Sequence, residues 1–274
     1  MDLRLNGKRA LVTGSSTGLG EEIAKVLAAE GAAVVVHGRD EARATAVAKA
    51  IREAGGEAAV AIGDLATDAG ADAVRTASAA GGPVDILVNN LGVYDPAAAW
   101  STLSSADWSA IYDTNVVSSV RTIQRFVPDM RERGWGRVIQ ISSVLGERPM
   151  ASQPHYAATN AARDNLATSL ARELKHTGVT SNSVAAGGIL TATTEAYLLD
   201  LGRRNGWGET WEEIEPKAVE ALAANDAGRI GRRRDYADLV AFLASPLSGY
   251  ITGTTLRADG GWYGLQYEAA EVMR

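Results

Sequence analysis

Ser143 and Tyr156 lie thirteen positions apart, and both carry hydroxyl groups that can act on a carbonyl group. Ser142 and Ser143 end an apolar run that indicates a buried strand, and Tyr156 lies on the long helical pattern that follows, within residues 139–171. A serine hydroxyl can polarise a carbonyl, and a phenol can pass a proton to its oxygen. Carbonyl reduction beside a nicotinamide needs both steps, so this segment is the candidate catalytic centre.

A glycine-rich turn near the start of the chain is typical of dinucleotide binding. The apolar run 9–13 ends at Gly14, and Gly18 and Gly20 precede a helical pattern that stops near Gly31. Bare backbone lets a pyrophosphate approach, and the amides of the helix N-terminus stabilise its charge. The spacing G-x-x-x-G-x-G differs from the commoner G-x-G-x-x-G, and an ordinary strand-to-helix turn is the alternative.

Alternating apolar strands and helices of 10 to 15 residues predict one α/β domain over residues 1–274. Such alternation favours a doubly wound, three-layer Rossmann fold in which helices cover both faces of a parallel sheet. The further strands expected are 33–37, 58–62, 84–89, 180–185 and 255–258. Ligands bind at the carboxyl ends of such strands. The residues at or just past strand ends are Gly14, His37, Asp64, Asn89 and Ser142.

The end of the second strand favours NADP(H) over NAD(H). A carboxylate there would bond the ribose 2′-hydroxyl and repel a 2′-phosphate. The chain instead has His37, Gly38 and Arg39, with no acidic residue before Asp40. Arg39 could pair a phosphate with two hydrogen bonds. The alternative is that Arg39 is a solvated charge at the start of a loop.

Two further segments have more than one interpretation. A helix is expected from Ser104 or Ser105 to Met130, and Asn115 lies among its apolar residues. Asn115 could kink this helix and hold a water near the active site, or it could be a hydrogen-bonded amide of the core. The irregular segment at about 191–226 suits a substrate lid. Its Trp207 and Trp211 could meet a partly apolar ligand, the body of the protein or another subunit.

Charge and composition argue against several other classes. The net charge of −6 suggests neither a nucleic-acid nor a membrane partner. The absence of cysteine excludes disulfides and thiolate metal sites, and no metal site is expected. The first residues have no signal pattern and no apolar run spans a bilayer, so a cytoplasmic location is the expectation.

Several motifs together resemble the short-chain dehydrogenase/reductase family, and especially its β-ketoacyl-carrier-protein-reductase-like members. They are TGSSTGLG (13–20), NNLG (89–92), Asn115, Ser143, Tyr156 and YITGTTLRADGG (250–261). The resemblance implies a seven-stranded sheet, a homotetramer (or a homodimer) and reduction of a ketone or 3-oxoacyl carbonyl to an alcohol.

The resemblance also implies roles for individual residues. Those expected at the pyrophosphate and its ribose are Gly14, Ser16, Thr17, Gly18, Leu19 and Gly20. Those expected at the adenosine are Asp64, Leu65, Asn90 and Gly92, and those at the nicotinamide and its ribose are Tyr156, Asn160, Ile189 and Thr191. Ser143 would bond the substrate oxygen, Tyr156 would be the acid/base, and Asn115 would hold a proton-relay water.

Three positions depart from the family pattern. Leu91 replaces an alanine and is expected to crowd the cofactor, and Ala186 replaces a proline and is expected to loosen the loop below the nicotinamide. Asn160 replaces the lysine of YxxxK, whose charge lowers the pKa of the tyrosine. Losing roughly two to three units of that shift would raise the barrier by about 3 to 4 kcal/mol, on the order of a hundred- to a thousandfold in rate.

Asn160 can still donate a hydrogen bond to the ribose, so cofactor binding should survive better than turnover. Arg163, further along the helix, could add positive potential, or be an arginine at a surface or subunit contact. Slow NADPH-dependent reduction is therefore the main interpretation. The alternatives are a non-redox enzyme (isomerase, dehydratase or cyclase) that uses Tyr156, and a non-catalytic protein that binds the cofactor.

Overall fold

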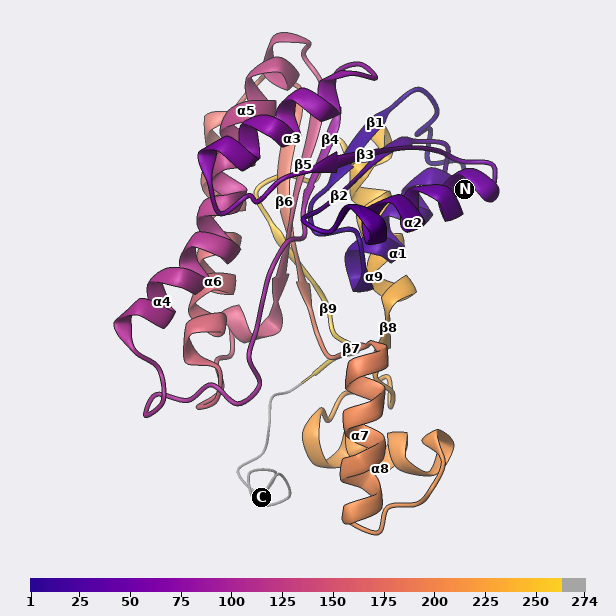
Figure 1. The fold of residues 1–274 in the computed structure, drawn as a ribbon, viewed down its shortest axis with the longest axis vertical. Helices are drawn as coiled ribbons and strands as arrows, with labels where there is room; N and C mark the ends of the chain where they lie inside the picture. The colour runs from indigo at the N-terminus through magenta and orange to yellow at the C-terminus, as the bar shows by residue number, and fades with distance from the viewer. Residues whose placement is uncertain (263–274) are drawn as a thin grey trace.

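A seven-stranded parallel sheet forms the centre of the protein (Figure 1). The computed structural model describes residues 1–262, so residues 263–274 of the predicted domain lie outside the described part. The sheet order is β3-β2-β1-β4-β5-β6-β9. The strands are β1 (Arg9–Val12), β2 (Ala33–Gly38), β3 (Glu57–Ile62), β4 (Ile86–Asn89), β5 (Gly136–Ser143), β6 (Val179–Ala186) and β9 (Thr255–Ala258). The predicted doubly wound α/β fold is confirmed.

Helices cover both faces of the sheet and so make three layers. On one face α1 (Gly18–Ala29), α2 (Glu41–Glu53) and α9 (Arg233–Ala244) pack on a core of Val, Ile, Leu and Ala side chains. On the other face α3 (Asp68–Ala79), α5 (Ser118–Glu132) and α6 (Pro154–Glu173) enclose a second core. Because both faces are covered, every residue of β1, β4, β5 and β6 is buried, which explains the continuous apolar runs in the sequence.

The helix expected from residue 104 or 105 to 130 is interrupted at Asn115. It consists of α4 (Ser105–Tyr112), a π-helical turn (Asp113–Val117) and α5. Single π-turns within a helix are rare and often lie at functional sites. The interruption brings Asn115 to the edge of the cavity described below.

The predicted lid is more regular than its glycines suggested. It contains α7 (Ala192–Arg204) and α8 (Trp211–Leu222), which pack on each other through Leu198, Leu201 and Ile214. These helices form a lobe beyond the carboxyl end of the sheet (Figure 1). A two-stranded sheet of β7 (Ile189–Leu190) and β8 (Gly231–Arg232) lies where this lobe joins the body.

Both tryptophans of the lobe pack on its own small core rather than on a ligand cavity. Trp207 and Trp211 contact the cluster around Ile214, and the indole Nε1 of Trp211 donates a 2.8 Å hydrogen bond to Glu215. From the sequence alone, these side chains could contact a ligand, the body of the protein or another subunit. In the structure they pack against the small apolar core of the lobe.

Within residues 1–262 no helix is both long enough and apolar enough to span a bilayer. The same part of the chain contains no group of three or more histidine or carboxylate side chains placed to hold a metal ion.

Candidate active site

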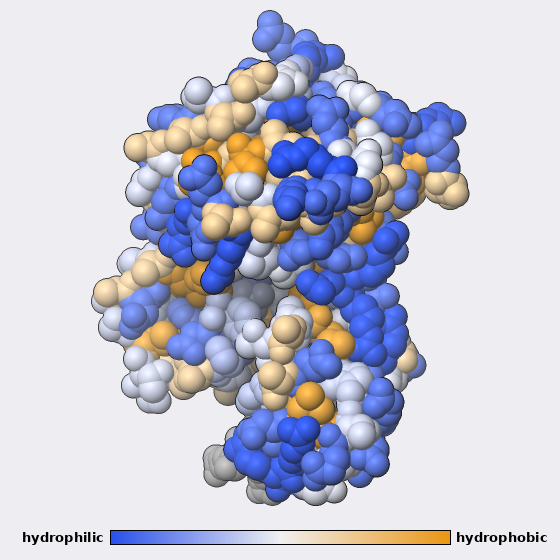
Figure 2. Space-filling model, turned by 45° about the vertical axis from the view of Figure 1, so that its right-hand side comes forward, coloured by the Kyte–Doolittle hydropathy of each residue, from blue (hydrophilic) through white to orange (hydrophobic). Residues whose placement is uncertain are grey.

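One cavity at the carboxyl end of the sheet gathers all of the predicted site residues. Its volume is about 590 Å³, within the range of sites for small molecules and cofactors. The space-filling view shows the surface hollowed between the body and the lobe of α7 and α8 (Figure 2). The predicted residues that line the cavity are Gly14, Ser16, Thr17, Gly18, Leu19, Gly20, Arg39, Asp64, Leu65, Asn90, Gly92, Asn115, Ser143, Tyr156, Asn160, Ile189 and Thr191.

The N-terminus of α1 is built to receive an anion. Thr17 is its N-cap residue, yet its side chain makes no capping bond, so the first amides of the helix keep their donors. Gly18 has a φ of +64°, and a Cβ placed there would have no atom within 4 Å, which leaves open space in front of the helix. These features fit the pyrophosphate of a dinucleotide.

Gly20 and Asn90 hold the glycine-rich turn against β4. A Cβ on Gly20 would lie 2.4 Å from the carbonyl oxygen of Gly14 and 2.5 Å from the side-chain nitrogen of Asn90. That nitrogen donates hydrogen bonds to the carbonyls of Thr13 (2.9 Å) and Gly14 (3.2 Å). Asn90 therefore positions the turn, in addition to facing the expected ribose site.

His37 is a structural part of the site to which the sequence assigned no role. Its Nδ1 accepts a 2.9 Å hydrogen bond from the amide of Gly14, and its Nε2 lies 3.1 Å from the carbonyl oxygen of Gly63. Burial lowers the pKa of His37 to about 4, so the ring is neutral at pH 7. A histidine at the end of the buried run 33–37 was the available signal.

Positive charge collects where β2 ends. Arg39 is exposed, lines the cavity and makes no ion pair within the described residues. Asp40 is occupied elsewhere, because it caps α2 through the amide of Arg43 (3.1 Å) and also pairs with the Arg43 guanidinium (3.3 Å). No carboxylate before Asp40 is available for a ribose diol at this strand end.

The expected adenine end of the cavity combines one polar and one buried residue. Asp64 lies at the surface and accepts a 3.0 Å hydrogen bond from the amide of Ala66. Leu65 is buried in the core and forms part of the cavity wall. Leu91 packs against the same core while it lines the cavity, and the space remains open beside it.

The two serines at the end of β5 have different environments. The hydroxyl groups of Ser142 and Ser183 each donate a 2.6 Å hydrogen bond to the carboxylate of Asp164, so Ser142 serves a buried network. Ser143 lines the cavity, and its hydroxyl accepts a long (3.3 Å) bond from the amide of Leu145 and faces the Tyr156 phenol. The structure therefore distinguishes Ser143 as the serine available to a ligand.

The phenol of Tyr156 shares the cavity with Ser143 and Asn160. Burial raises the pKa of Tyr156, while the charge of Arg163 and hydrogen bonds with Asn160 and Ser143 oppose that rise. The side-chain amide of Asn160 also donates a 2.8 Å hydrogen bond to the Tyr156 carbonyl, one turn back on α6. The ring of Tyr94 lies 5.9 Å away, measured between centroids.

Arg163 is buried beside the site, not on a helix surface. Its side chain is 4% exposed. Its guanidinium donates hydrogen bonds to the main-chain carbonyls of Asn115 (2.6 Å), Ile141 (2.5 Å) and Leu91. The three carbonyls come from the π-helical turn, β5 and the loop after β4. The surface alternative for this arginine is therefore wrong.

The side-chain amide of Asn115 makes three hydrogen bonds. Its oxygen accepts from the amide of Val93 (2.8 Å), and its nitrogen donates to the Val93 carbonyl (2.9 Å) and to Thr159 (3.3 Å). A relay water could use the main-chain carbonyl of Asn115, which also accepts from Arg163, or the remaining lone pair of its side-chain oxygen.

The nicotinamide end of the cavity follows β6. Ala186 is paired with Ser143 of β5 and Ala258 of β9, so the loosening expected there is not seen. Ile189 is half-buried in β7, and Thr191 caps α7 by accepting a 3.1 Å bond from the amide of Thr194. Both residues lie where the body meets the lid.

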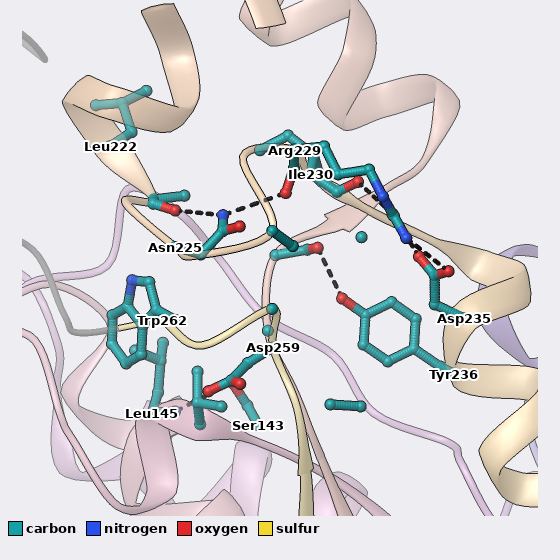
Figure 3. A pocket seen from close by; sticks show the side chains of 18 of the residues that line it. Ser143, Leu145, Leu222, Asn225, Arg229, Ile230, Asp235, Tyr236, Asp259 and Trp262 are labelled. Carbon is teal, nitrogen blue, oxygen red and sulfur yellow. Dashed lines mark hydrogen bonds and ion pairs between the residues drawn. The ribbon is translucent and has the colours of Figure 1, made fainter. Parts of the chain in front are cut away.

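A second, mostly apolar cavity of about 350 Å³ adjoins the first and shares Ser143 and Gly187 with it. Its apolar walls are formed by Val144, Leu145, Met150, Leu222, Ile230 and Trp262. Among its polar side chains, Arg229 bonds Asp235 at 2.6 Å and 2.9 Å, and the Tyr236 hydroxyl donates to the main-chain carbonyl of Gly188 at 2.8 Å (Figure 3). The side-chain nitrogen of Asn225 donates to the carbonyls of Ala223 and Arg229. This cavity provides space for an apolar group beside Ser143.

Known proteins share both the sequence and the fold of this chain. The sequence profile of the family described as short chain dehydrogenase matches residues 8–201. An uncharacterised oxidoreductase, YvaG of Bacillus subtilis, is 38% identical over 264 residues, covering 95% of this chain and 98% of that protein.

Two solved structures extend the comparison. A 3-oxoacyl (acyl-carrier-protein) reductase of Agrobacterium tumefaciens with NADP bound is 35% identical with a TM-score of 0.85, covering 95% of this chain and 96% of that one. L-sorbose reductase of Gluconobacter frateurii, complexed with NADPH and L-sorbose, is 30% identical with a TM-score of 0.87, covering 95% and 98%. With the profile match and the shared fold, this chain belongs to the short-chain dehydrogenase family and is an NAD(P)-dependent oxidoreductase of that family.

Proposed function

We propose that this protein is an NADP(H)-dependent reductase that converts a ketone or 3-oxoacyl-type carbonyl to an alcohol. The observation that carries the proposal is that Ser143 and Tyr156 line the same cavity as the uncapped N-terminus of α1. A cofactor anchored by its pyrophosphate at that helix would extend toward the two hydroxyl groups.

Three features of the cavity support NADP(H) as the cofactor. The open space at Gly18 receives the pyrophosphate, and Arg39 has no ion-pair partner in the described part of the chain, which suits a 2′-phosphate. Asn160 offers an amide to the nicotinamide ribose, in addition to its bond to Tyr156. Both solved relatives compared above contain NADP or NADPH.

Two residues of the chain act on the substrate: Ser143 orients its carbonyl group, and Tyr156 supplies the proton to its oxygen. The hydride for the carbonyl carbon would come from a nicotinamide held beside Asn160, Ile189 and Thr191. Ser143 donates a hydrogen bond to the carbonyl oxygen and so stabilises the charge that develops there. Tyr156 passes its phenolic proton to that oxygen, which completes the alcohol and leaves a phenolate that solvent reprotonates.

The second cavity favours a substrate with an apolar substituent. A carbonyl bonded to Ser143 would direct one substituent toward Leu145, Met150 and Trp262. The nearby Arg229 is already paired with Asp235, so few free donors remain for the hydroxyl groups of a sugar. A medium-length 3-oxoacyl chain or an alkyl or aryl ketone therefore suits the site better than a polyol.

Consumption of NADPH at 340 nm across a panel of 3-oxoacyl thioesters, alkyl and aryl ketones and keto sugars tests this proposal. We expect turnover of the apolar carbonyls, with Tyr156→Phe slower by about 10²–10⁴-fold and with NADPH binding retained. Activity that persists in Tyr156→Phe, or product formed without NADPH consumption, would refute it in favour of non-redox chemistry. NADPH binding with no turnover of any carbonyl would instead favour a non-catalytic role.

We further propose a homotetramer or homodimer that uses the outer surfaces of α5 and α6. Ile123, Val127 and Leu170 border a shallow groove between these two helices. Light scattering during gel filtration gives the subunit number directly, and a monomer at micromolar concentration would refute the proposal.

A further inference from the structure

Arg163 carries a buried charge without a carboxylate bonded to it. Within residues 1–262 no acidic side chain lies within ion-pair distance of its guanidinium, although the charge of neighbouring Asp164 acts on it favourably. Burial lowers the pKa of Arg163 to about 10, so it remains a cation at neutral pH. Burying such a charge costs several kcal/mol before compensation. Main-chain carbonyls alone supply its direct bonds.

Those bonds hold the guanidinium in one orientation beside the catalytic cavity. Its three nitrogens each donate to a different carbonyl, those of Asn115, Ile141 and Leu91. The carbonyls belong to three separate segments that meet only in the folded protein. A cation bonded in this way cannot swing toward solvent, so its field at the cavity is constant.

Among the described cations that line this cavity, Arg163 is the one that lies on the helix of Tyr156. Arg39 follows β2, and Arg43 lies in the first turn of α2. Asn160 lies between Tyr156 and Arg163 along α6 and carries no charge. Arg163 is therefore the cation whose charge acts on the phenol.

We propose that the guanidinium of Arg163 is the fixed cation that stabilises the phenolate of Tyr156, a function that the neutral Asn160 does not perform. Arg163 acts through Tyr156 and is thus a positioning residue. The inference rests on the proposed function, in which Tyr156 is the acid/base. It also implies that the loss of rate expected from the missing lysine is partly offset.

Several groups around the phenol contribute to its titration. Burial and the neighbouring Tyr94 raise the pKa of Tyr156, whereas Arg163, Asn160 and Ser143 lower it. The charges of Tyr156 and Asp164 raise the pKa of Arg163 against its burial, and Asp164 is itself bonded to Ser142 and Ser183. Removal of the Arg163 charge should therefore shift the phenol toward its protonated form.

The direct test is a pH titration of Tyr156 by NMR in protein labelled with ¹³C at the tyrosine Cζ. The full chain is used without cofactor, and Tyr156→Phe assigns the resonance. In Arg163→Met we expect the phenolate fraction of Tyr156, compared at one fixed pH below the Arg163 pKa of about 10, to fall by about tenfold or more. In Arg163→Lys, which keeps the charge, the fraction should stay closer to that of the parent.

Two further variants keep the test decisive. Arg163→Gln is neutral but can still donate to two of the carbonyls, so it replaces Arg163→Met if the latter does not fold. Asn160→Lys combined with Arg163→Gln should restore the phenolate fraction, because the cation returns on the same helix. An unchanged titration in the neutral variants would overturn the proposal and leave Arg163 as a structural tie.

The same titration separates this inference from the proposed function. Loss of reductase activity in Tyr156→Phe concerns the role of the tyrosine, whereas the titration of Tyr156 reports only its coupling to Arg163. If Tyr156→Phe kept its activity while the coupling was present, the proposed function would fail and the electrostatic relationship would stand.

Discussion

The Nδ1 atom of His37 accepts a 2.9 Å hydrogen bond from the backbone amide of Gly14. The bond ties the end of β2 to the glycine-rich turn after β1. It requires a lone pair on Nδ1, so it exists only while the ring is neutral. The proton of the neutral ring then lies on Nε2, which faces the carbonyl of Gly63.

Stability should therefore depend on pH through His37. Its pKa is about 4 when folded and about 6.5 when unfolded. Between these values the unfolded chain binds more protons, so the free energy of unfolding falls as pH falls from 6.5 toward 4. His37 alone should account for a loss of about 3 kcal/mol across that window.

Urea unfolding of the parent and of His37→Asn at pH 7 and pH 4.5 measures this contribution. Carboxylates titrate in both proteins, so the difference between the two pH dependences isolates His37. If the free energy of unfolding fell by the same amount in the parent and in His37→Asn between pH 7 and pH 4.5, the prediction would be contradicted. NADPH affinity of the folded parent should fall only as the pH approaches the folded-state pKa of about 4, because protonation of Nδ1 breaks the bond to the turn.

Arg39→Ala should weaken NADPH and leave NADH nearly unchanged. A charge-assisted bond to a 2′-phosphate is worth about 1.5–3 kcal/mol, or roughly 10- to 150-fold in Kd. Fluorescence titration of both cofactors gives the ratio. Lys49→Ala is the control, since Lys49 also carries one positive charge but lies on α2 paired with Glu53 and outside the cavity. Equal weakening of both cofactors would place Arg39 away from the phosphate.

Asn160→Lys should raise kcat by less than about tenfold, since the charge of Arg163 already acts on the phenol. The new ammonium would lie three residues from a buried cation on the same helix, so we also expect a lower Tm. Stopped-flow and steady-state NADPH consumption measure the rate, and calorimetry measures Tm. Asn160→Met, which removes the bond to Tyr156 without adding charge, is the matched control. A gain of a hundredfold or more would mean that Arg163 does not replace the lysine.

Gly202→Ala should loosen the lid and spare the dinucleotide site. A Cβ at Gly202 would lie 2.5 Å from a methyl of Ile214, so α7 and α8 would have to move apart. Overpacking of this kind costs about 1–3 kcal/mol. We expect faster hydrogen exchange in residues 192–222, a higher KM for the carbonyl substrate and an unchanged Kd for NADPH. Thr193→Ala, exposed on the same helix, should change none of these. A weaker NADPH complex in Gly202→Ala would contradict this separation.

The existence of the strands and the location of the cavity at their carboxyl ends followed from local patterns. The strand 255–258 has the expected bounds, and β2 ends within one residue of its predicted end. Both depend on continuous apolar runs and on the residues that stop them, which are properties of neighbouring positions. Because parallel strands must place their carboxyl ends along one edge, the predicted residues were bound to meet once those strands formed.

Only the tertiary structure showed the surroundings of Arg163, His37 and the two lid tryptophans. Helical periodicity places Arg163 on a face of α6 but does not say which carbonyls surround that face. The same holds for Trp207 and Trp211, which the sequence could assign to a ligand, to the body or to a subunit. Burial and hydrogen-bond partners arise from segments distant in the chain, as the carbonyls of Leu91, Asn115 and Ile141 around one guanidinium show. The sequence by itself determined the fold and the set of residues at the cavity, while long-range packing decided which charge acts on Tyr156.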